Sequence, residues 1–379
     1  MPIRDDIQYI PGNTRGSDYV VGDIHGCATE LQQLLMGLEA DDRLFIVGDL
    51  FDRGPNSLAV YEAVKDDSRV NVVRGNHEDV FVSCMDINLE SMVSELENII
   101  SGQIKTFSNR DASIQAAALW RFFVGGGSWV FKNRGADLIM LNPNVMSISS
   151  FARYLPYLKE GFIPEVAAIR DYLAQLPYIL SVSAAVNPLV GDVPPFLICH
   201  ADLPLTDEEL ADGPKFLTPD QIIYVTHARE RDFIVRRTES STVCYCGHSP
   251  HVSGGAVVRP KTNMCNLDTG AYSNSVLMRV NHTQRLVEPI VGNDFSGAWK
   301  FMSACRRLED TEENRIQFDC ERKWYLDGPV WLIIQDYLRA KYPPTSLAKP
   351  IECNALEDDI VEDDDDSIEY KIPHRLRLC

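Results

Sequence analysis

The chain has 379 residues, of which 45% are hydrophobic and 24% charged, and its formal net charge is −19. These proportions are typical of a globular protein with one large domain or two ordinary ones, and the negative charge argues against a general nucleic-acid binder. No apolar run approaches the ~20 residues that a membrane helix needs, so we expect no membrane span. We predict a cytoplasmic protein, and export as a bacterial effector into a host cell stays open, because the sequence does not test it.

Three short apolar runs in the first eighty residues each end in a polar motif. A polar leading segment, residues 1–17, precedes them. The runs are 19–21, 44–47 and 70–73, and they are followed by G-D-I-H-G at 22–26, G-D at 48–49 and R-G-N-H-E at 74–78. Apolar residues at helical spacing between the runs predict strand, helix, strand, helix, strand with right-handed crossovers. Ligands of such sheets bind at the carboxyl ends of the strands, where these motifs lie.

The middle of the chain changes character before strands return. Helical periodicity predicts a helical insertion over 79–124, residues 131–163 predict a further insertion, and residues 164–175 predict a short helix. Apolar runs at 196–199, 242–246, 264–267, 276–280 and 285–290 predict strands. We expect these strands to form a second sheet, mixed or antiparallel, that packs on the first.

The last part of the chain predicts a separate extension. We predict a catalytic domain over residues 1–290 and a C-terminal extension over 291–379. Residues 357–369 hold nine acidic side chains and no Lys or Arg, which is typical of a solvated tail. A partner-binding or autoinhibitory segment is the alternative. We expect the insertions and the extension to shape substrate access or to dock a partner.

Polar side chains at the predicted strand ends could together hold two metal ions. Carboxylate, amide and imidazole groups are ligands of divalent ions, and a carboxylate can bridge two of them through its two oxygens. Two ions roughly 3.5–4 Å apart suit displacement at phosphorus, because they activate a shared water and neutralise the phosphoryl oxygens. The six candidate ligands are Asp23, His25, Asp49, Asn76, His200 and His248, with Asp49 as the bridge.

Further side chains could handle the phosphoryl group itself. His77 could protonate the departing oxygen, with Asp52 orienting its imidazole. Arg53 offers a planar fork for phosphate oxygens, and Arg229 is a second candidate clamp, with Arg231 as its nearest rival. Asp202 could be a carboxylate behind the ligands or a surface turn residue. The remaining histidines are expected to be ordinary polar residues: His227, His251, His282 and His374.

Other hydrolytic chemistries lack their signatures in this sequence. None of the ten cysteines is followed six positions later by Arg, which the cysteine route to phosphate hydrolysis requires. A G-x-S-x-G elbow and a G-x-x-x-x-G-K-[ST] loop are also absent. The cysteines include no C-x-x-C pair, so we expect a reducing compartment and buried free thiols.

The motifs closely resemble those of the phosphoprotein phosphatase branch of the calcineurin-like metallophosphoesterases. That branch's G-D-x-H-G, G-D-x-x-D-R-G and G-N-H-E signatures stand at 22–26, 48–54 and 75–78. The chain is more similar still to the phage lambda type of bacterial phosphatase. The residues that fit that type are 198–202, 229–231, 247–250, 268–271, and the three glycines 125–127 followed by Trp129. The resemblance covers about residues 18–290.

The resemblance implies an α/β fold, the calcineurin-like αβ-sandwich of two mixed β-sheets flanked by helices, around a dinuclear metal site. Mn²⁺ is the expected metal, with Fe or Zn as alternatives. One ion would be held by Asp23, His25 and Asp49, and the other by Asp49, Asn76, His200 and His248. The acid pair would be His77 with Asp52, and the phosphate clamp Arg53 with Arg229.

Three functions compete for this site. The leading one is a metal-dependent phosphoprotein phosphatase that hydrolyses phosphoserine and phosphothreonine, and phosphotyrosine as a further option, by attack of a metal-bridging hydroxide on a phosphorylated protein. The second is a dinucleotide-polyphosphate (Ap4A-type) hydrolase. That type tends to lose the Asp of Asp-Arg-Gly and to end the third motif in Asp, whereas this chain has Asp52 and Glu78. The third is a catalytically dead phospho-binding module, which would show a substituted ligand, and none of the six ligands is substituted.

Overall fold

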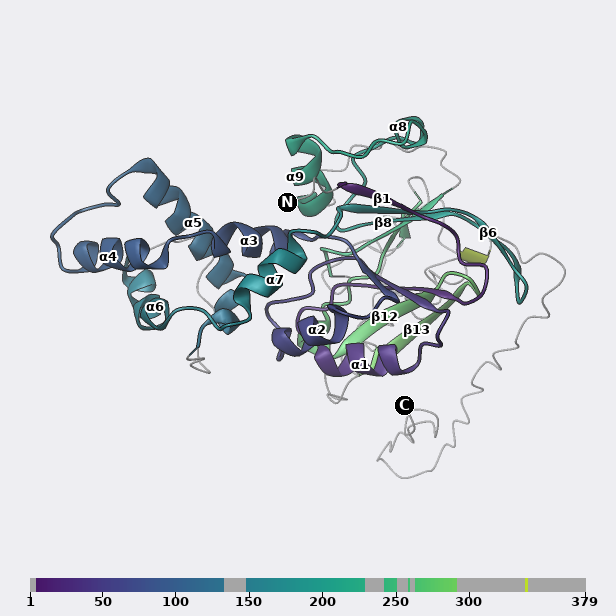
Figure 1. Ribbon diagram of the computed structural model, residues 1–379, viewed down its shortest axis with the longest axis horizontal. Coiled ribbons are helices and arrows are strands. Elements are labelled where there is room, and N and C mark those ends of the chain that lie inside the picture. The colour runs from purple at the N-terminus through teal and green to yellow at the C-terminus, as the bar shows by residue number, and fades with distance from the viewer. Residues whose placement is uncertain are drawn as a thin grey trace, which may run out of the picture.

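The computed structural model describes residues 5–132, 148–228, 242–250, 258–259, 263–291 and 338–339. Two mixed β-sheets form the body of the molecule, and helices flank them (Figure 1). This is the αβ-sandwich that the sequence predicted, so the fold class is confirmed. None of the described helices is both long and apolar enough to span a membrane.

The first sheet contains the strand–helix–strand unit that the early motifs predicted. Its five strands have the order β13-β12-β2-β3-β4. Strands β2 (Asp18–Val21), β3 (Arg43–Ile46) and β4 (Val70–Val72) are parallel, and helices α1 (Ala28–Met36) and α2 (Ser57–Val64) connect them. Their carboxyl ends therefore meet at one edge of the sheet.

The second sheet has six strands in the order β1-β5-β8-β9-β11-β10. These are β1 (Ile7–Ile10), β5 (Ile179–Val182), β8 (Phe196–Cys199), β9 (Val243–Cys246), β11 (Met264–Asn266) and β10 (Val258–Arg259). Strands β8, β9 and β11 are parallel to one another. A separate hairpin of β6 (Ala185–Asn187) and β7 (Gly191–Val193) follows β5.

Two expectations about strand placement are wrong. Strands β12 (Val276–Asn281) and β13 (Leu286–Val291) belong to the first sheet, because β12 pairs antiparallel with β2, Arg279 opposite Val21. The leading segment holds strand β1, which pairs parallel with β5. In both cases the partner strand lies more than 160 residues away in the chain, so local sequence pattern does not indicate the pairing.

The predicted insertions form a helical lobe beside the sheets (Figure 1). The predicted helical stretch contains α3 (Asn76–Met85), α4 (Leu89–Ile100) and α5 (Arg110–Val124), followed by the short helix η1 (Gly127–Val130). The further insertion contains the helix α6 (Ile148–Glu160), which the sequence did not predict. Tyr154 and Leu158 of α6 are buried in the same apolar cluster as Met92 and Leu96 of α4. Helix α7 (Val166–Leu173) leads back to the sheets.

Side chains of both sheets share one buried apolar cluster. Val20 and Phe45 of the first sheet and Ile198 and Tyr245 of the second are all fully buried in it. Leu338, one of the three described residues of the predicted extension, is also fully buried in this cluster. Part of the extension therefore packs into the body of this chain, while the boundary at residue 290 stays a prediction.

Candidate active site

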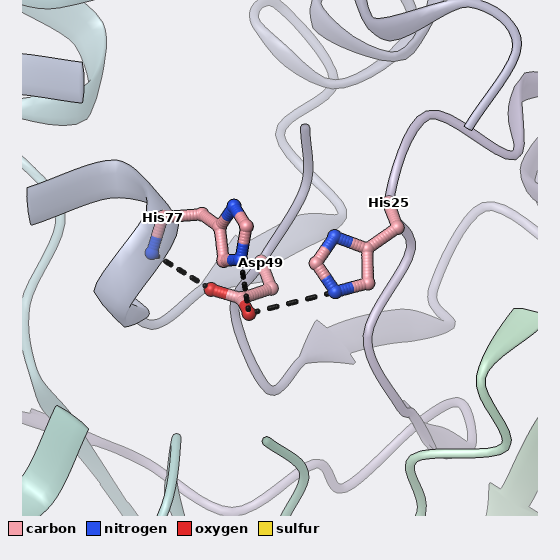
Figure 2. Close-up of side chains that lie close together, drawn as sticks. All are labelled: His25, Asp49 and His77. Atoms are coloured by element: carbon pink, nitrogen blue, oxygen red, sulfur yellow. Dashed lines mark hydrogen bonds and ion pairs between the residues drawn. The ribbon is translucent and has the colours of Figure 1, made fainter. Parts of the chain in front are cut away.

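The loops that follow β2 and β3, together with the first turn of α3 after β4, bring His25, Asp49 and His77 together (Figure 2). Both imidazole rings turn a nitrogen towards the same oxygen of the Asp49 carboxylate. Nε2 of His25 lies 3.6 Å and Nε2 of His77 3.8 Å from Oδ2 of Asp49. The His77 backbone N–H also donates to Oδ1 of Asp49 at 3.1 Å. All three residues are at least 95% buried.

The second sheet supplies side chains to the other side of Asp49. His200 follows β8, and its Nε2 lies 3.4 Å from Oδ1 of Asp49 and 2.9 Å from Oδ1 of Asn76. His248 follows β9, and its Nδ1 lies 2.9 Å from the same Asn76 oxygen. The ligand atoms of Asp49, His200 and His248 all lie within 4.8 Å of one another. Asp49 is thus shared by two groups of candidate ligands, as a bridging residue would be.

Asp23 completes the set from the loop after β2. Its carboxylate oxygens accept the backbone N–H of His248 at 3.0 and 3.2 Å, so it lies between the two sheets. A Cβ at Gly247 would collide with this carboxylate, which explains why the position before His248 is a glycine. The structure therefore brings all six predicted ligands to one edge, and their roles as ligands stay a prediction.

Hydrogen bonds behind the rings set the tautomers of two histidines. Nδ1 of His25 lies 2.9 Å from the carbonyl oxygen of Phe51, and Nδ1 of His200 lies 2.9 Å from that of Val47. An Nδ1–H that donates to a carbonyl leaves Nε2 with its lone pair, which is the form that binds a metal. In both residues Nε2 faces Asp49.

The donor set at this edge fits divalent cations. Imidazole nitrogens, carboxylate oxygens and an amide oxygen converge here at distances of 2.9–3.6 Å. Burial, together with the neighbouring Asp268 and Asp49 carboxylates, raises the pKa of Asp23 well above its usual value. Burial also raises the pKa of Asp268 to about 6. A divalent ion would relieve this mutual repulsion and satisfy the converging acceptors.

His77 and Asp52 form a buried pair next to these ligands. Nδ1 of His77 lies 2.7 Å from Oδ2 of Asp52. Burial alone would lower the pKa of His77, but the Asp49 and Asp52 carboxylates raise it above its usual value. With Nδ1 of His77 donating to Asp52, Nε2 faces Asp49 and Arg53, and it can carry the second proton of a protonated ring once the Arg53 guanidinium, 2.9 Å away, has turned from it. This arrangement can deliver a proton into the site.

The guanidinium of Arg53 contacts both His25 and His77. Its Nη1 lies 3.1 Å from Nε2 of His25, and its Nη2 lies 2.9 Å from Nε2 of His77. The same guanidinium lies 5.2 Å from the ring centroid of Tyr272, which is 39% exposed. Arg53 thus stands between the buried ligands and the surface. Arg229 and Arg231 lie outside the described residues.

The backbone of this edge is held in an uncommon conformation. Eight described residues other than glycine have a positive φ, and five of them are candidate site residues: His25, Asp49, Asp52, Arg53 and His248. Non-glycine residues with positive φ cost free energy and persist where the surroundings determine them. The strain indicates that the fold holds these side chains in place for a function.

Glu78 has a role that the motif alone did not reveal. Its carboxylate accepts the backbone N–H groups of Asp49 at 2.9 Å, Leu50 at 2.8 Å and Gly75 at 2.8 Å. Burial and the Asp49 charge raise the pKa of Glu78 to about 7. Glu78 therefore ties the loop of the third motif to that of the second. The sequence feature that could have indicated this role is the position of Glu78 directly after His77.

Three other polar residues differ in their distance from the site. Asp202 is buried and accepts the Leu203 backbone N–H and the Tyr224 hydroxyl, so it organises its own loop. His282 lies between the Tyr245 hydroxyl and the Pro194 carbonyl, within the body of the molecule. The ring of His227 lies 6.3 Å from that of His248, which places it at the margin of the site. The sequence had treated His227 as an ordinary polar residue.

The chain is similar to known phosphoesterases. A family model described as "Calcineurin-like phosphoesterase" matches residues 19–256. The symmetrical bis(5'-nucleosyl)-tetraphosphatase of Coxiella burnetii (strain RSA 493) is 47% identical over 78 residues, which is 20% of this chain and 25% of that protein. The protein of the same name from Proteus mirabilis is 47% identical over 64 residues, 16% of this chain and 23% of that protein. These alignments span about a quarter of the length of the curated relatives. The structure of a putative diadenosine tetraphosphatase matches with 16% identity and a TM-score of 0.41, over 76% of this chain and 98% of that one.

Proposed function

Because the chain belongs to the calcineurin-like phosphoesterase family, we propose that it is a metal-dependent phosphatase that hydrolyses phosphoserine and phosphothreonine in proteins. The observation that carries this proposal is the Asp52–His77 pair, with its 2.7 Å contact. An alkoxide is a poor leaving group, so hydrolysis of a serine or threonine phosphate needs an acid at the departing oxygen. Phosphotyrosine, whose leaving group is better, is a further substrate that the same site can serve.

The six predicted ligands would hold two divalent ions, with Mn²⁺ as the proposed metal. Bound there, such ions lower the pKa of a water and neutralise the charge of the phosphoryl oxygens. The carboxylate of Asp49 would be shared between them, since it faces His25 on one side and His200 on the other. The ring orientations of His25 and His200 need no change, because their Nδ1 atoms already contact carbonyl oxygens.

The other residues of the site divide the remaining tasks. The guanidinium of Arg53 would exchange its contacts with His25 and His77 for two phosphoryl oxygens, which its planar fork matches. His77 would then donate the proton on Nε2 to the departing oxygen, and Asp52 would stabilise the protonated ring until that step. Glu78 holds the loops of Asp49 and Gly75 in register throughout.

A symmetrical bis-nucleosyl-tetraphosphatase is the second candidate, and the curated relatives favour it. The departing group in that reaction is a nucleoside diphosphate, which is far more acidic than an alcohol. An enzyme for that reaction needs less help from a general acid. The Asp52–His77 pair is therefore the feature on which the two candidates differ.

The two candidates can be separated with purified full-length protein in Mn²⁺. The substrates are a panel of phosphoserine, phosphothreonine and phosphotyrosine peptides beside diadenosine tetraphosphate. The Asp49→Asn variant, prepared in parallel, controls for contaminating phosphatases. We expect phosphate release from the phosphopeptides at the higher kcat/KM. Turnover of diadenosine tetraphosphate to ADP with no turnover of any phosphopeptide would overturn the proposal.

A further inference from the structure

The Asp52 carboxylate has a second partner besides His77. The indole Nε1–H of Trp129 donates to Oδ1 of Asp52 at 2.7 Å, while Oδ2 contacts Nδ1 of His77 at 2.7 Å. We propose that Trp129 is a positioning residue, which fixes the plane of the Asp52 carboxylate and thereby aims Nε2 of His77 at the departing oxygen. This inference rests on the proposed function above.

The geometry around Asp52 explains why a second partner matters. The backbone of Asp52 is fixed, since its N–H donates to Oγ of Ser57 at 3.0 Å and its φ is 72°. Its side chain is 2% exposed, so solvent does not replace a lost hydrogen bond easily. Without the indole, Oδ1 would lose this donor, and the carboxylate would turn to find another. Such a turn would carry the His77 ring with it.

Trp129 is itself held firmly. Its ring stacks on Phe81 of α3, with centroids 5.8 Å apart and an interplanar angle of 27°, and lies 5.4 Å from Phe51. The glycine segment before it approaches the catalytic loop closely. Gly126 has a φ of 99°, and a Cβ there would lie 2.5 Å from the backbone nitrogen of Arg53. The glycines between α5 and η1 therefore let η1 approach the catalytic loop and hold the Trp129 indole against Asp52.

A purely structural tryptophan would present a different contact. If Trp129 only filled space among Phe51 and Phe81, its N–H would not need to meet a carboxylate. Instead the one polar atom of the ring contacts the buried carboxylate of the acid pair. An indole N–H is a donor only, so it also excludes the alternative in which Asp52 donates at Oδ1.

Trp129→Phe tests the inference with little change to the packing, because the aromatic ring on Phe51 and Phe81 is retained. The matched control is Trp120→Phe, since Trp120 is a buried tryptophan of α5 and the same substitution there removes an indole N–H from the core. Activity is compared on phenyl phosphate, which has a poor leaving group, and on 2,4-dinitrophenyl phosphate, which has a good one. We expect Trp129→Phe to lose about tenfold or more in kcat on phenyl phosphate and less than about twofold on the dinitrophenyl ester.

A double variant and a spectroscopic measurement complete the test. In an Asp52→Asn background, Trp129→Phe should add no further loss on phenyl phosphate, because the two residues act through one contact. Independently of activity, the indole N–H signals of the five tryptophans can be followed by ¹⁵N NMR in protein loaded with diamagnetic Mg²⁺ or Zn²⁺. Trp129→Phe identifies the signal of Trp129, and we expect Asp52→Asn to shift that signal more than any other.

The outcomes distinguish this inference from the proposed function. If Trp129→Phe shows the same leaving-group dependence as Trp120→Phe and the unmodified protein, the positioning role is wrong. It is also wrong if Asp52→Asn does not move the Trp129 signal. If no phosphomonoester is hydrolysed but diadenosine tetraphosphate is, the proposed function fails. Trp129→Phe, Asp52→Asn and the double variant are then compared on diadenosine tetraphosphate. Equal losses in the two single variants that do not add in the double variant support the positioning role, and no loss in Trp129→Phe overturns it.

Discussion

At the carboxyl edge of the two sheets the buried side chains are polar and crowded, whereas the space between the sheets is filled by apolar side chains. The edge holds the carboxylates of Asp23, Asp49 and Asp268 in one cluster. Burial and the neighbouring carboxylates raise the pKa of Asp23 and of Asp268, and the loops of this edge contain residues with positive φ. The interior holds residues such as Phe45 and Ile198, fully buried among other apolar groups. The edge destabilises the fold locally, and the interior stabilises it.

This difference predicts whether a substitution lowers mainly activity or mainly stability. A change at the edge removes a charge or a donor that the fold does not need for its packing, so activity should fall more than stability. A change between the sheets removes contacts and leaves a cavity, so stability should fall more than activity per folded molecule. The expected effects below run from the largest to the smallest.

Replacing Asp49 with Asn should have the largest effect. The variant keeps the size of the side chain but loses the charge that faces both groups of imidazoles. We expect metal occupancy to fall below two ions and turnover to drop by about a thousandfold or more. Elemental analysis and phosphopeptide assays measure both quantities. Asp202→Asn, a buried carboxylate outside the ligand set, should keep both ions, and unchanged two-metal occupancy in Asp49→Asn would contradict the bridge.

His77→Ala should separate the acid from the ligands. We expect this variant to retain both metals and to lose about 10²–10⁴-fold in turnover of serine and threonine phosphates, because the proton donor is gone. His227→Ala is the control, since its ring lies at the margin of the site and outside the Asp52 pair. Metal content is determined beside kcat on a substrate with a poor leaving group. Full activity of His77→Ala on that substrate would refute the acid role.

Leu338→Ala tests the interior and, with it, the extension. The Leu338 side chain is fully buried in the cluster between the sheets, so we expect a loss of about 2–5 kcal/mol in the free energy of unfolding. The kcat of the folded fraction should change little. Met36→Ala, at a side chain that is 79% exposed, should stay within about 0.5 kcal/mol. Denaturant unfolding of both variants gives the comparison, and equal stability would show that the extension does not contribute to the core.

The same two regions differ in how far the sequence predicts them. The edge is predictable where a strand and its motif are contiguous, because a polar residue placed directly after an apolar run lies at the end of a strand. His25, Asp49 and His77 are of this kind. Strand ends also pointed to His200 and His248, but only the fold shows that they meet Asp49 from the second sheet.

Contacts between distant segments could not be predicted in this way. Strand β12 joins the first sheet through its pairing with β2, and neither sequence carries a local sign of the other. Helix α6 forms in a stretch of mixed composition because Tyr154 and Leu158 pack with α4. Trp129 was noted for its place after three glycines, and its contact with Asp52 depends on the fold that joins residues 77 positions apart.

The smallest expected effect concerns His282, a buried imidazole of the interior. Burial lowers its pKa from 6.5 to about 4, and the neutral ring accepts from the Tyr245 hydroxyl while donating to the Pro194 carbonyl. Between these two pH values the unfolded chain binds a proton that the folded chain does not. The contribution of His282 to stability is therefore complete above pH 6.5 and is lost as the pH falls towards 4, by about 1.4 kcal/mol per pH unit.

His282→Gln removes this titration and keeps one donor and one acceptor. Its free energy of unfolding, measured in denaturant at intervals from pH 7 to pH 4.5, should fall less steeply than that of the unmodified protein. The difference between the two slopes should approach one proton, because carboxylates such as Glu78 and Asp268 titrate in both proteins and cancel. Parallel curves would mean that His282 is protonated in the folded protein as easily as in the unfolded one. The interior around His282 would then tolerate a positive charge.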